Sequence, residues 1–397
     1  MSLEFAPARM EPARIEEMSA ELPNLAAELT AQAGQLGGKL APRTLADMAN
    51  MVRLMNSYYS NRIEGNNTRP RDIERALAGN FDDDPAKRAM QQENAAHIRL
   101  QAEIDRMAPE GTLPDPSSEA FIRFLHREFY RGVEPDALHV SDNVYVVPGE
   151  WRLHDVEVGL HVPPPFATIP AFMAHFHQRF RLDWMKGRTE RILGMATAHH
   201  RFAWIHPFQD GNGRVSRLMS HAMAHHAGIG AGGLWSVSRG MARGLQGGFE
   251  GREEYKARMA LADRPRQGDR DGRGNLSLAA LVSFATWFLT VCLDQVQFMG
   301  SLYEIDKLEH RFFQLAVDRD LSEDAAPLIK ALLRLGEISR STVPLIMGKS
   351  ERTAQRVTKH MIGIGMIGSD SPKGPLSLRF PAMHSETLFP KLFDITV

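Results

Sequence analysis

The residues with the clearest chemistry lie in one short stretch, His206-Pro207-Phe208-Gln209-Asp210-Gly211-Asn212-Gly213-Arg214, followed by Arg217. The two glycines of this stretch let successive backbone N–H groups point into one concavity, an arrangement that binds phosphate. A helix is expected to begin near Gly213, and its positive dipole end would face the same point. The stretch therefore predicts an anion cradle at the start of a helix.

The side chains around this cradle have complementary chemistry. Arg214 and Arg217 lie one turn apart on the expected helix and can offer planar forks to phosphate oxygens. Asp210 is a hard oxygen ligand suited to a Mg²⁺ ion that bridges phosphates. His206 titrates near neutral pH and could deprotonate a hydroxyl. The alternative is an ordinary glycine turn with an Asp N-cap, but such a turn does not need all these groups in order. We interpret the stretch as a nucleotide-handling site.

The stretch resembles the signature of Fic (filamentation induced by cAMP) domain enzymes, His-x-Phe-x-Asp/Glu-Gly-Asn-Gly-Arg-x-x-Arg. Every signature position is filled between His206 and Arg217, and the resemblance extends over roughly residues 43–302. Members of this family transfer AMP from ATP to a Ser, Thr or Tyr hydroxyl of a protein. A related branch, similar to the Doc toxin, has Lys at the position of Gly213 and acts as a kinase. Gly213 therefore disfavours the kinase branch.

The resemblance implies a role for each signature residue. His206 would be the general base on the target hydroxyl, and Asp210 would hold Mg²⁺ against the α- and β-phosphates of ATP. Arg214 would stabilise charge on the phosphates, and Arg217 would grip the γ-phosphate. Positioning and charge neutralisation would then supply most of the rate, as they do in phosphoryl transfer generally.

The resemblance also implies a role for the loop backbone. The amides around Gly211 and Gly213 would cradle the phosphates, and Asn212 would fix the loop. The adenine pocket is poorly defined by the sequence. Three residues are candidates for its lining, Trp235, Ser238 and Tyr255.

A second segment, Ser60-Asn61-Arg62-Ile63-Glu64-Gly65, resembles the inhibitory-helix pattern of the family, Ser/Thr-x-x-x-Glu-Gly/Asn. Its position upstream of the signature is similar to that in members with N-terminal inhibition. A Glu at the end of a docked helix could pair with Arg217 and take the place of the γ-phosphate. The resemblance thus implies that Glu64, with Ser60 in the same helix, restrains the enzyme; the alternative is a plain exposed Glu. Some members use the same Glu and His to remove AMP from a target, so the direction stays open.

Apolar periodicity predicts the helices that position these residues. An amphipathic helix is expected from Thr44 to Ile63, ending in Glu64-Gly65, where Gly is a usual helix stop. Further helices are expected over 85–107, 118–131, 169–184, 190–205 and 214–226. The last two bracket the glycine loop.

Alternating valines with Pro and Gly punctuation between 143 and 165 predict a short β-hairpin or flap. The resemblance includes its start, Gly149-Glu150-Trp151-Arg152, and implies that the hairpin over 143–162 clamps the target backbone by strand addition. Four other histidines are expected to be structural, namely His199, His200, His225 and His226, and Arg201 is expected to be a surface or packing residue. Asp269 and Asp271 are expected to be turn residues rather than a calcium site.

The C-terminal section looks like a separate domain. Short helices are expected over 328–335, 341–347 and 350–362, followed by a hairpin over 369–380 with a turn at 372–374, an order that describes a winged helix. From residue 328 onward, ten Lys and Arg residues face five Asp and Glu residues. Four polar residues share one face of the third helix: Arg352, Gln355, Arg356 and Lys359. A rival hypothesis is therefore a DNA-binding regulator with a nucleotide-sensing Fic-like part, although winged helices also serve as interaction modules.

The amino-acid composition excludes several classes of protein. The 397 residues carry 47 Lys and Arg against 48 Asp and Glu, so no global field draws the protein to nucleic acid or anionic lipid. The single cysteine, Cys292, excludes a disulfide framework and a thiolate metal cluster. The N-terminus lacks the apolar core of a signal peptide. The uncharged stretch 276–293 has a polar stripe, so we expect a core helix rather than a membrane span, and a cytoplasmic protein.

The sequence thus predicts a mainly α protein: a Fic-type helical bundle with a small β-hairpin flap and a C-terminal winged helix-turn-helix domain. The expected domains are an N-terminal helical region over 1–110 with its inhibitory helix at about 44–64, a catalytic domain over 111–302, and a winged-helix domain over 305–397. The expected function is Mg²⁺-dependent protein adenylyltransfer from ATP, restrained by Glu64; the alternatives are the DNA-binding regulator and AMP removal. The expected partner is a hydroxyl-bearing target protein. Self-modification and a homodimer are left open, DNA is not favoured, and no membrane is expected.

Overall fold

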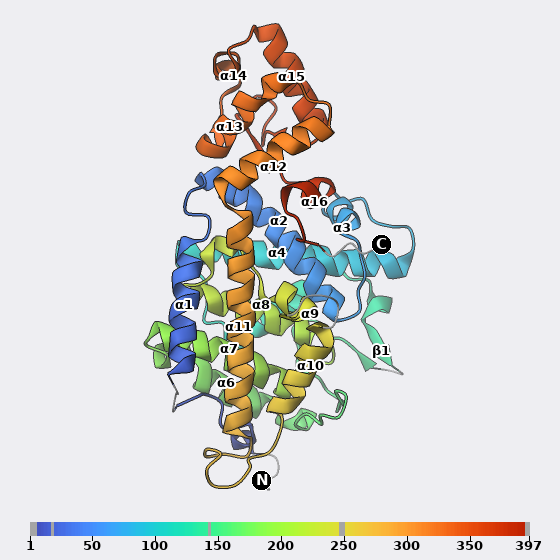
Figure 1. Cartoon of the computed structure of the whole chain (residues 1–397). Coiled ribbons are helices and arrows are strands. Elements are labelled where there is room, and N and C mark those ends of the chain that lie inside the picture. The colour runs from blue at the N-terminus through green and yellow to red at the C-terminus, as the bar shows by residue number, and fades with distance from the viewer. Residues whose placement is uncertain (1–5, 17–19, 142–143, 246–250, 394–397) are drawn as a thin grey trace.

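A computed structural model describes residues 6–16, 20–141, 144–245 and 251–393 of the chain (Figure 1). The mainly α prediction is confirmed, since helices dominate and the strands form two small sheets. The helices of the N-terminal and central parts are α1 (Glu21–Gln35), α2 (Pro42–Ile63), α3 (Pro70–Leu77), α4 (Pro85–Glu110), α5 (Glu119–Phe129), α6 (Ile169–Phe180), α7 (Arg188–Ile205), α8 (Asn212–His226), α9 (Val237–Arg243), α10 (Gly251–Ala262) and α11 (Leu278–Leu302).

The core is built around the antiparallel pair α7 and α8, which the glycine loop joins. α8 packs against α4 and α5 on one side, and α7 packs against α6 and α11 on the other. α2 crosses the molecule between α4 and α9, so the predicted inhibitory helix lies inside the assembly. It begins at a proline, whose missing N–H costs nothing in the first turn, and ends with Glu64 as its C-cap before Gly65 at φ 94°.

The predicted flap differs from the structure. Strand β1 (His139–Ser141) pairs antiparallel with β2 (Val144–Tyr145), so the first strand precedes the expected range; Asn143 lies outside the described residues. Between 146 and 165 the described backbone holds only an isolated bridge between Val158 and His161. The buried guanidinium of Arg152 binds backbone carbonyls of this segment, including that of Pro164, in place of a strand partner.

The C-terminal residues form a smaller unit at the top of Figure 1. Its elements are α12 (Ile305–Asp318), α13 (Ala326–Leu335), β3 (Glu337–Ile338), α14 (Val343–Met347), α15 (Glu351–Gly363), β4 (Ile367–Gly368), β5 (Leu376–Leu378) and α16 (Ser385–Leu388). β5 lies between β3 and β4 and pairs antiparallel with both. The three short helices lie where expected, whereas β4 precedes the expected hairpin range by two residues and β3 was not predicted.

This unit contacts the predicted inhibitory helix directly. In the first turns of α2, Arg43 forms an ion pair with Asp370, which lies next to β4. Asp47 forms one with Arg379, which lies next to β5. Near the other end of α2, the Tyr59 hydroxyl donates a hydrogen bond of 3.1 Å to the carbonyl of Leu392.

α11 is the one helix in the described part of the chain that is long and apolar enough to cross a membrane, and 61% of its most apolar window is buried in the protein. The stripe of polar residues along it is half-buried or exposed, whereas the apolar residues pack inward: examples are Phe284, Phe288 and Cys292. The expectation of a core helix with one polar face agrees with this packing.

The N-terminal segment covers a buried charge. Arg201 is 0% exposed, and its Nε and Nη2 donate to the carbonyl oxygen of Pro12 at 3.0 and 2.8 Å. Of the two expectations for Arg201, surface or packing, the structure supports packing. Glu11 adds bonds to His175 and Arg179 on α6, which fix the segment over α6 and α7.

Candidate active site

The loop between α7 and α8 is held in place by the side chain of Asn212. α7 ends at Ile205, His206 takes the left-handed conformation as its C-cap, and α8 begins at Asn212. The Asn212 side chain accepts a hydrogen bond from the Phe208 N–H at 2.9 Å and donates one to the Phe208 carbonyl at 2.8 Å. Asn212 therefore fixes the loop in the position where the start of α8 forms its concave surface.

Glu64 reaches into this concave surface. A Cβ placed on Gly213 would stand 2.1 Å from Oε1 of Glu64, so only a glycine leaves room for the carboxylate at the first turn of α8. Backbone N–H groups without helical partners and the positive end of the helix dipole both favour an anion there. The predicted anion cradle and the predicted inhibitory Glu thus meet in the structure.

Arg217 binds the end of α2. Its Nη2 lies 2.7 Å from Oε1 of Glu64 and 2.9 Å from the carbonyl oxygen of Ser60, and its Nε lies 2.8 Å from the Ser60 hydroxyl. The guanidinium is 1% exposed and the Glu64 carboxylate 37% exposed, so the pair forms at the wall of an open site. The last terminal nitrogen, Nη1, is buried without a hydrogen-bond acceptor among the described residues.

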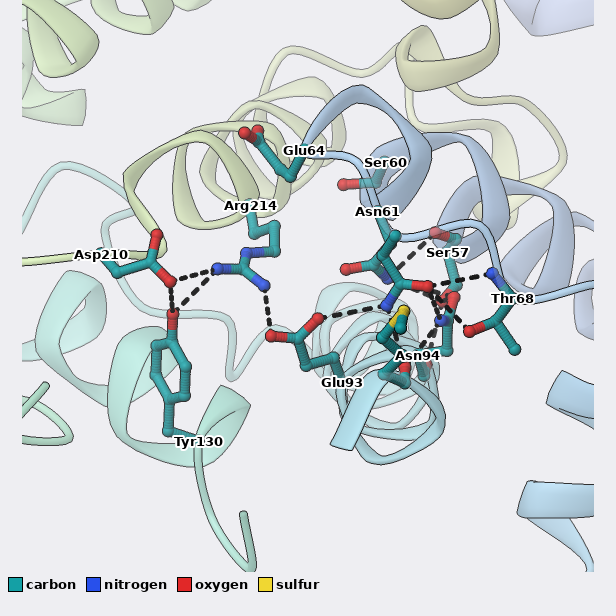
Figure 2. A network of polar contacts seen from close by, with 12 residues as sticks. Ser57, Ser60, Asn61, Glu64, Thr68, Glu93, Asn94, Tyr130, Asp210 and Arg214 are labelled. Atoms are coloured by element: carbon teal, nitrogen blue, oxygen red, sulfur yellow. Dashed lines mark hydrogen bonds and ion pairs between the residues drawn. The ribbon is translucent and has the colours of Figure 1, made fainter. Parts of the chain in front are cut away.

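Arg214 and Asp210 belong to a second network, in which Arg214 lies between Asp210 with Tyr130 and Glu93 (Figure 2). Nη2 of Arg214 donates to Oδ2 of Asp210 at 2.7 Å and to the Tyr130 hydroxyl at 2.9 Å, and Nη1 donates to Glu93 at 2.6 Å. The Tyr130 hydroxyl donates to the same Oδ2 at 2.8 Å. Glu93 in turn accepts a bond from Asn66, just beyond α2.

His206 lies at the other end of the loop with one nitrogen committed. Its Nδ1 lies 3.3 Å from the carbonyl oxygen of Ala203, which can only accept, so Nδ1 carries the proton and Nε2 is left as a base. Arg152 fixes the backbone of His206 by donating from Nε to its carbonyl oxygen at 2.9 Å. Burial lowers the pKa of His206 to about 4, so the imidazole is neutral near pH 7.

The two carboxylates of the site are ionised despite their surroundings. Burial alone would raise the pKa of the Glu64 carboxyl, but the charges of Arg217 and Arg214 outweigh it and lower that pKa. Burial likewise opposes ionisation of Asp210, and the charge of Arg214 with the bonds from Gly211 and Tyr130 lowers its pKa. With Glu93, which also pairs with Arg214, three carboxyl groups contact the two guanidinium groups of the site.

The other histidines named from the sequence are structural. His199 and His200 are 0% exposed, and His199 bridges Ser220 and the Tyr255 hydroxyl at 2.9 and 2.8 Å. His225 and its neighbour on α8, His221, both place Nε2 on Oδ1 of Asp105, at 3.0 and 2.7 Å, while Arg53 binds Oδ2 at 2.8 Å.

The remaining residues predicted from the sequence lie outside the glycine loop itself. Nε2 of His226 lies 3.1 Å from the carbonyl oxygen of Pro114. Of the adenine-pocket candidates, Trp235 and Ser238 line a small cavity together with Arg217, and Tyr255 is buried against His199 with its hydroxyl also interacting with Arg217. Asp271 caps the turn before α11 by accepting from the N–H groups of Gln267 and Ala279, which agrees with the turn-residue expectation.

Several residues at the site were missed in the sequence: Glu93, His126, Tyr130 and Asn66. Glu93 lies on α4, His126 and Tyr130 lie on or directly after α5, and Asn66 follows α2, so all of them are distant from the signature along the chain. No local spacing marks them, because their relation to the loop exists only after α4 and α5 pack on α8.

The donor set fits a magnesium-bound polyphosphate. Nη1 of Arg217 is a buried donor that lacks an acceptor, and the space over Gly213 already holds an anion. Asp210 offers a carboxylate whose side chain is 53% exposed, and a hard oxygen of this kind is what Mg²⁺ prefers.

Comparison with known proteins identifies the central region. Residues 116–224 match the family model described as the Fic/DOC family. A protein adenylyltransferase Fic from Drosophila willistoni is 37% identical over 108 residues, which cover 26% of this chain and 19% of that protein. A protein of the same name from Aedes aegypti is 37% identical over 84 residues, 20% of this chain and 16% of its own length. The chain thus matches less than a fifth of the length of these relatives.

Two solved structures share the fold. A Fic family protein from Desulfovibrio desulfuricans G20 superposes with a TM-score of 0.52 at 20% identity, covering 91% of this chain and 97% of that one. A Fic domain containing signaling protein from Bacteroides thetaiotaomicron gives a TM-score of 0.53 at 20% identity, covering 72% and 97% of the two chains.

Proposed function

We propose that the protein, whose residues 116–224 match the Fic/DOC family model, transfers AMP from ATP to a hydroxyl group of a target protein. The observation that carries this proposal is the neutral His206 with a free Nε2 at one end of a loop whose other end binds an anion. A base beside a phosphate cradle is what attack of a hydroxyl on a phosphate requires.

In this proposal Nε2 of His206 removes the proton of a target Ser, Thr or Tyr. The hydroxyl oxygen forms a bond to the α-phosphorus, the bond from that phosphorus to the β-phosphate oxygen breaks, and pyrophosphate leaves. Backbone amides around Gly211 and Gly213 and the guanidinium of Arg214 stabilise the charge that develops. Asp210 would hold Mg²⁺, which supplies further charge neutralisation when it is bound.

Glu64 restrains the reaction in the same proposal. Its carboxylate accepts a hydrogen bond from Nη2 of Arg217 and fills the space above Gly213. A γ-phosphate would otherwise bind there. Ser60 supports this arrangement by fixing Nε of Arg217. ATP must therefore displace Glu64, or bind with its triphosphate out of line.

The target would approach from the side of the 156–162 segment. Leu160 is fully exposed, Val162 is 72% exposed, and His161 anchors the segment to the end of α7 through the Trp204 carbonyl at 2.7 Å. An extended target segment could pair with this exposed backbone and bring its hydroxyl to His206. We place this reaction in the cytoplasm and leave the target, the homodimer and AMP removal to experiment.

The test uses the Glu64→Gly protein with ATP labelled at the α- or the γ-phosphate. Label retained on protein from the α-phosphate alone supports AMP transfer, and loss of that label in His206→Ala assigns the base. Label retained only from the γ-phosphate means a kinase and contradicts the proposal.

A second candidate function is DNA binding by the C-terminal unit, which we interpret as a winged helix. Arg352, Arg356 and Lys359 are exposed on α15, and none of them forms an ion pair with another described residue. A salt-dependent shift of duplex DNA by the full chain would support this function, and no shift at low salt would oppose it.

A further inference from the structure

We propose that Tyr130 is a positioning residue that aims the Asp210 carboxylate at the metal ion, an inference that rests on the proposed function. Tyr130 lies directly after α5, which ends at Phe129, and no feature of the signature includes it. It is 4% exposed and lies beneath the glycine loop, where it touches three of the groups that handle the phosphates.

The hydroxyl of Tyr130 has one orientation. It accepts a hydrogen bond from Nη2 of Arg214 at 2.9 Å, and it donates its own proton to Oδ2 of Asp210 at 2.8 Å. A guanidinium nitrogen can only donate, so the bond from Arg214 leaves the hydroxyl proton directed at Asp210. The hydroxyl is therefore a donor to Asp210.

The consequence for Asp210 is an asymmetric carboxylate. Oδ2 accepts from both Tyr130 and Arg214, whereas Oδ1 receives no side-chain hydrogen bond from the described residues. An oxygen without side-chain donors is the one that can bind a cation, and donors on the other oxygen fix the rotation of the group. Tyr130 thus selects which oxygen faces the phosphates.

The same stretch of chain also supports the loop backbone. One turn before Tyr130, His126 accepts the N–H of Gly149 at Nδ1 (2.8 Å), so its Nε2 carries the proton and donates to the Asp210 carbonyl at 3.2 Å. The His126 ring stacks on Phe208 with centroids 3.8 Å apart. A Cβ on Gly211 would lie 2.9 Å from the Tyr130 ring, so the ring and the loop are in close contact.

The parent for the test is the Glu64→Gly, His206→Ala protein loaded with ATP. Its Mn²⁺ affinity, measured by electron paramagnetic resonance, is compared with that of the same protein carrying Tyr130→Phe. Loss of a group that orients a metal ligand weakens metal binding by roughly 10- to 100-fold, and we expect a loss in this range. ATP binding without metal should change less than about twofold, because the phenyl ring keeps its packing. In the Glu64→Gly protein, the Mg²⁺ concentration for half-maximal AMP transfer should rise in parallel.

Tyr303→Phe is the matched control, since it removes another buried hydroxyl, one that donates to the Leu234 carbonyl at 3.0 Å. Equal Mn²⁺ affinity in Tyr130→Phe and the parent would overturn the inference, whatever the melting temperature does. If this parent binds Mn²⁺ with ATP while the Glu64→Gly protein with His206 intact transfers no AMP, the proposed function is refuted and the Tyr130 comparison stays readable. A parent that binds no Mn²⁺ with ATP would refute both.

Independent contacts lead us to infer that the C-terminal unit holds α2 against the catalytic loop. At the first turns of α2, Asp47 is 7% exposed and accepts from Arg43 at 2.9 Å and from Arg379 at 2.7 Å. Asp370 binds the same two arginines, each at 2.6 Å. Four alternating charges therefore join the β4–β5 hairpin to the helix that carries Glu64.

A second grip lies just before Glu64. The Leu392 carbonyl accepts from the Tyr59 hydroxyl at 3.1 Å and from Nε of Arg239 at 3.2 Å, and Phe393 packs edge-on against Tyr58 with centroids 5.6 Å apart. Because the next residue, Ser60, holds Arg217, a shift of the C-terminal segment would move the inhibitory contacts with it. A partner that pulls this unit from α2 would release the enzyme.

The test uses Asp370→Asn in the full chain. Loss of an exposed ion pair changes an equilibrium constant roughly two- to fivefold. We therefore expect the rate of AMP transfer to rise by about that factor, and the deuterium uptake of residues 56–66 to rise in parallel. No further rise in transfer is expected when Glu64→Gly is also present, because the restraint is then already absent. The control is Asp324→Asn, which removes an ion pair with Lys349 inside the C-terminal unit. Uptake over 56–66 equal to wild type would overturn the inference, and uptake can be read even if the proposed activity fails.

Discussion

Oε1 of Glu64 lies 2.7 Å from Nη2 of Arg217 and 2.1 Å from the point where a Cβ on Gly213 would stand. The Glu64 carboxylate thus contacts both the Arg217 guanidinium and the first turn of α8. These are the two groups that the sequence predicts to bind phosphate. One side chain from residue 64 fills the anion cradle built around residue 213, with Ser60 bonded to the same guanidinium.

Replacing Glu64 by Gly should strengthen ATP binding and AMP transfer. A hydrogen bond between charged groups is worth about 1.5–3 kcal/mol, which corresponds to roughly a 10- to 100-fold change. Calorimetry with ATP and transfer of α-labelled AMP measure the two effects. Glu110→Gly is a matched control, because Glu110 also lies at the end of a helix before a glycine, and among the described residues its ion pair is with Arg106 on the surface. Equal activity of Glu64→Gly and wild type would refute autoinhibition.

The rate of AMP transfer should be insensitive to pH around neutrality. Because burial lowers the pKa of His206 to about 4, the base is unprotonated above that value and becomes protonated only below it. Initial rates of Glu64→Gly at saturating Mg²⁺ and ATP should therefore be flat from about pH 5.5 to 8 and fall toward pH 4. A fall centred near pH 6.5, the ordinary value for histidine, would contradict the burial of this imidazole.

Gly211 should be more costly to replace than another left-handed glycine. Gly211 has φ 81° and a Cβ there would meet the Tyr130 ring at 2.9 Å, whereas Gly79 has φ 85° and open space around it. Gly79→Ala should cost about 1 kcal/mol of unfolding free energy from backbone strain alone, and Gly211→Ala about 2–4 kcal/mol. Urea denaturation measures both. Equal losses would mean that the loop moves freely away from α5.

Asp105→Asn should destabilise the fold without touching the loop. Asp105 binds Arg53, His221 and His225 and is 8% exposed, so its removal leaves a largely buried guanidinium without its counter-charge. The expected loss is about 3–5 kcal/mol of unfolding free energy. Asp269→Asn, at a fully exposed position, should change the midpoint of denaturation little. A loss below about 1 kcal/mol for Asp105→Asn would mean that water replaces the carboxylate.

The sequence was informative where the chemistry is local. His206 to Arg217 form one continuous segment, so their spacing on a turn and a helix could be inferred before the fold was known. Helix periodicity likewise located α2, α7 and α8 within a few residues. Apolar spacing carries this information because each helix turns a single face to the core.

The sequence was uninformative where the site depends on packing. Tyr130 and Glu93 reach Arg214 from 84 and 121 residues away, and Asp105 reaches His221 from 116 residues away. No local pattern encodes such pairs. The flap was misplaced for a related reason: alternating valines suggested strands, but Arg152 satisfies the carbonyls there, and exposed valines remain in an irregular segment.

The bond between Arg201 and the Pro12 carbonyl bears on how the protein tolerates proteolytic trimming. Two nitrogens of a fully enclosed guanidinium depend on this one carbonyl, and burial already lowers the pKa of Arg201 to about 10. A chain clipped after residue 16 would leave Nε and Nη2 of that buried cation without their acceptor. The N-terminal segment thus supplies the acceptor for a buried arginine of α7. A fragment made to isolate the catalytic region needs to keep this segment.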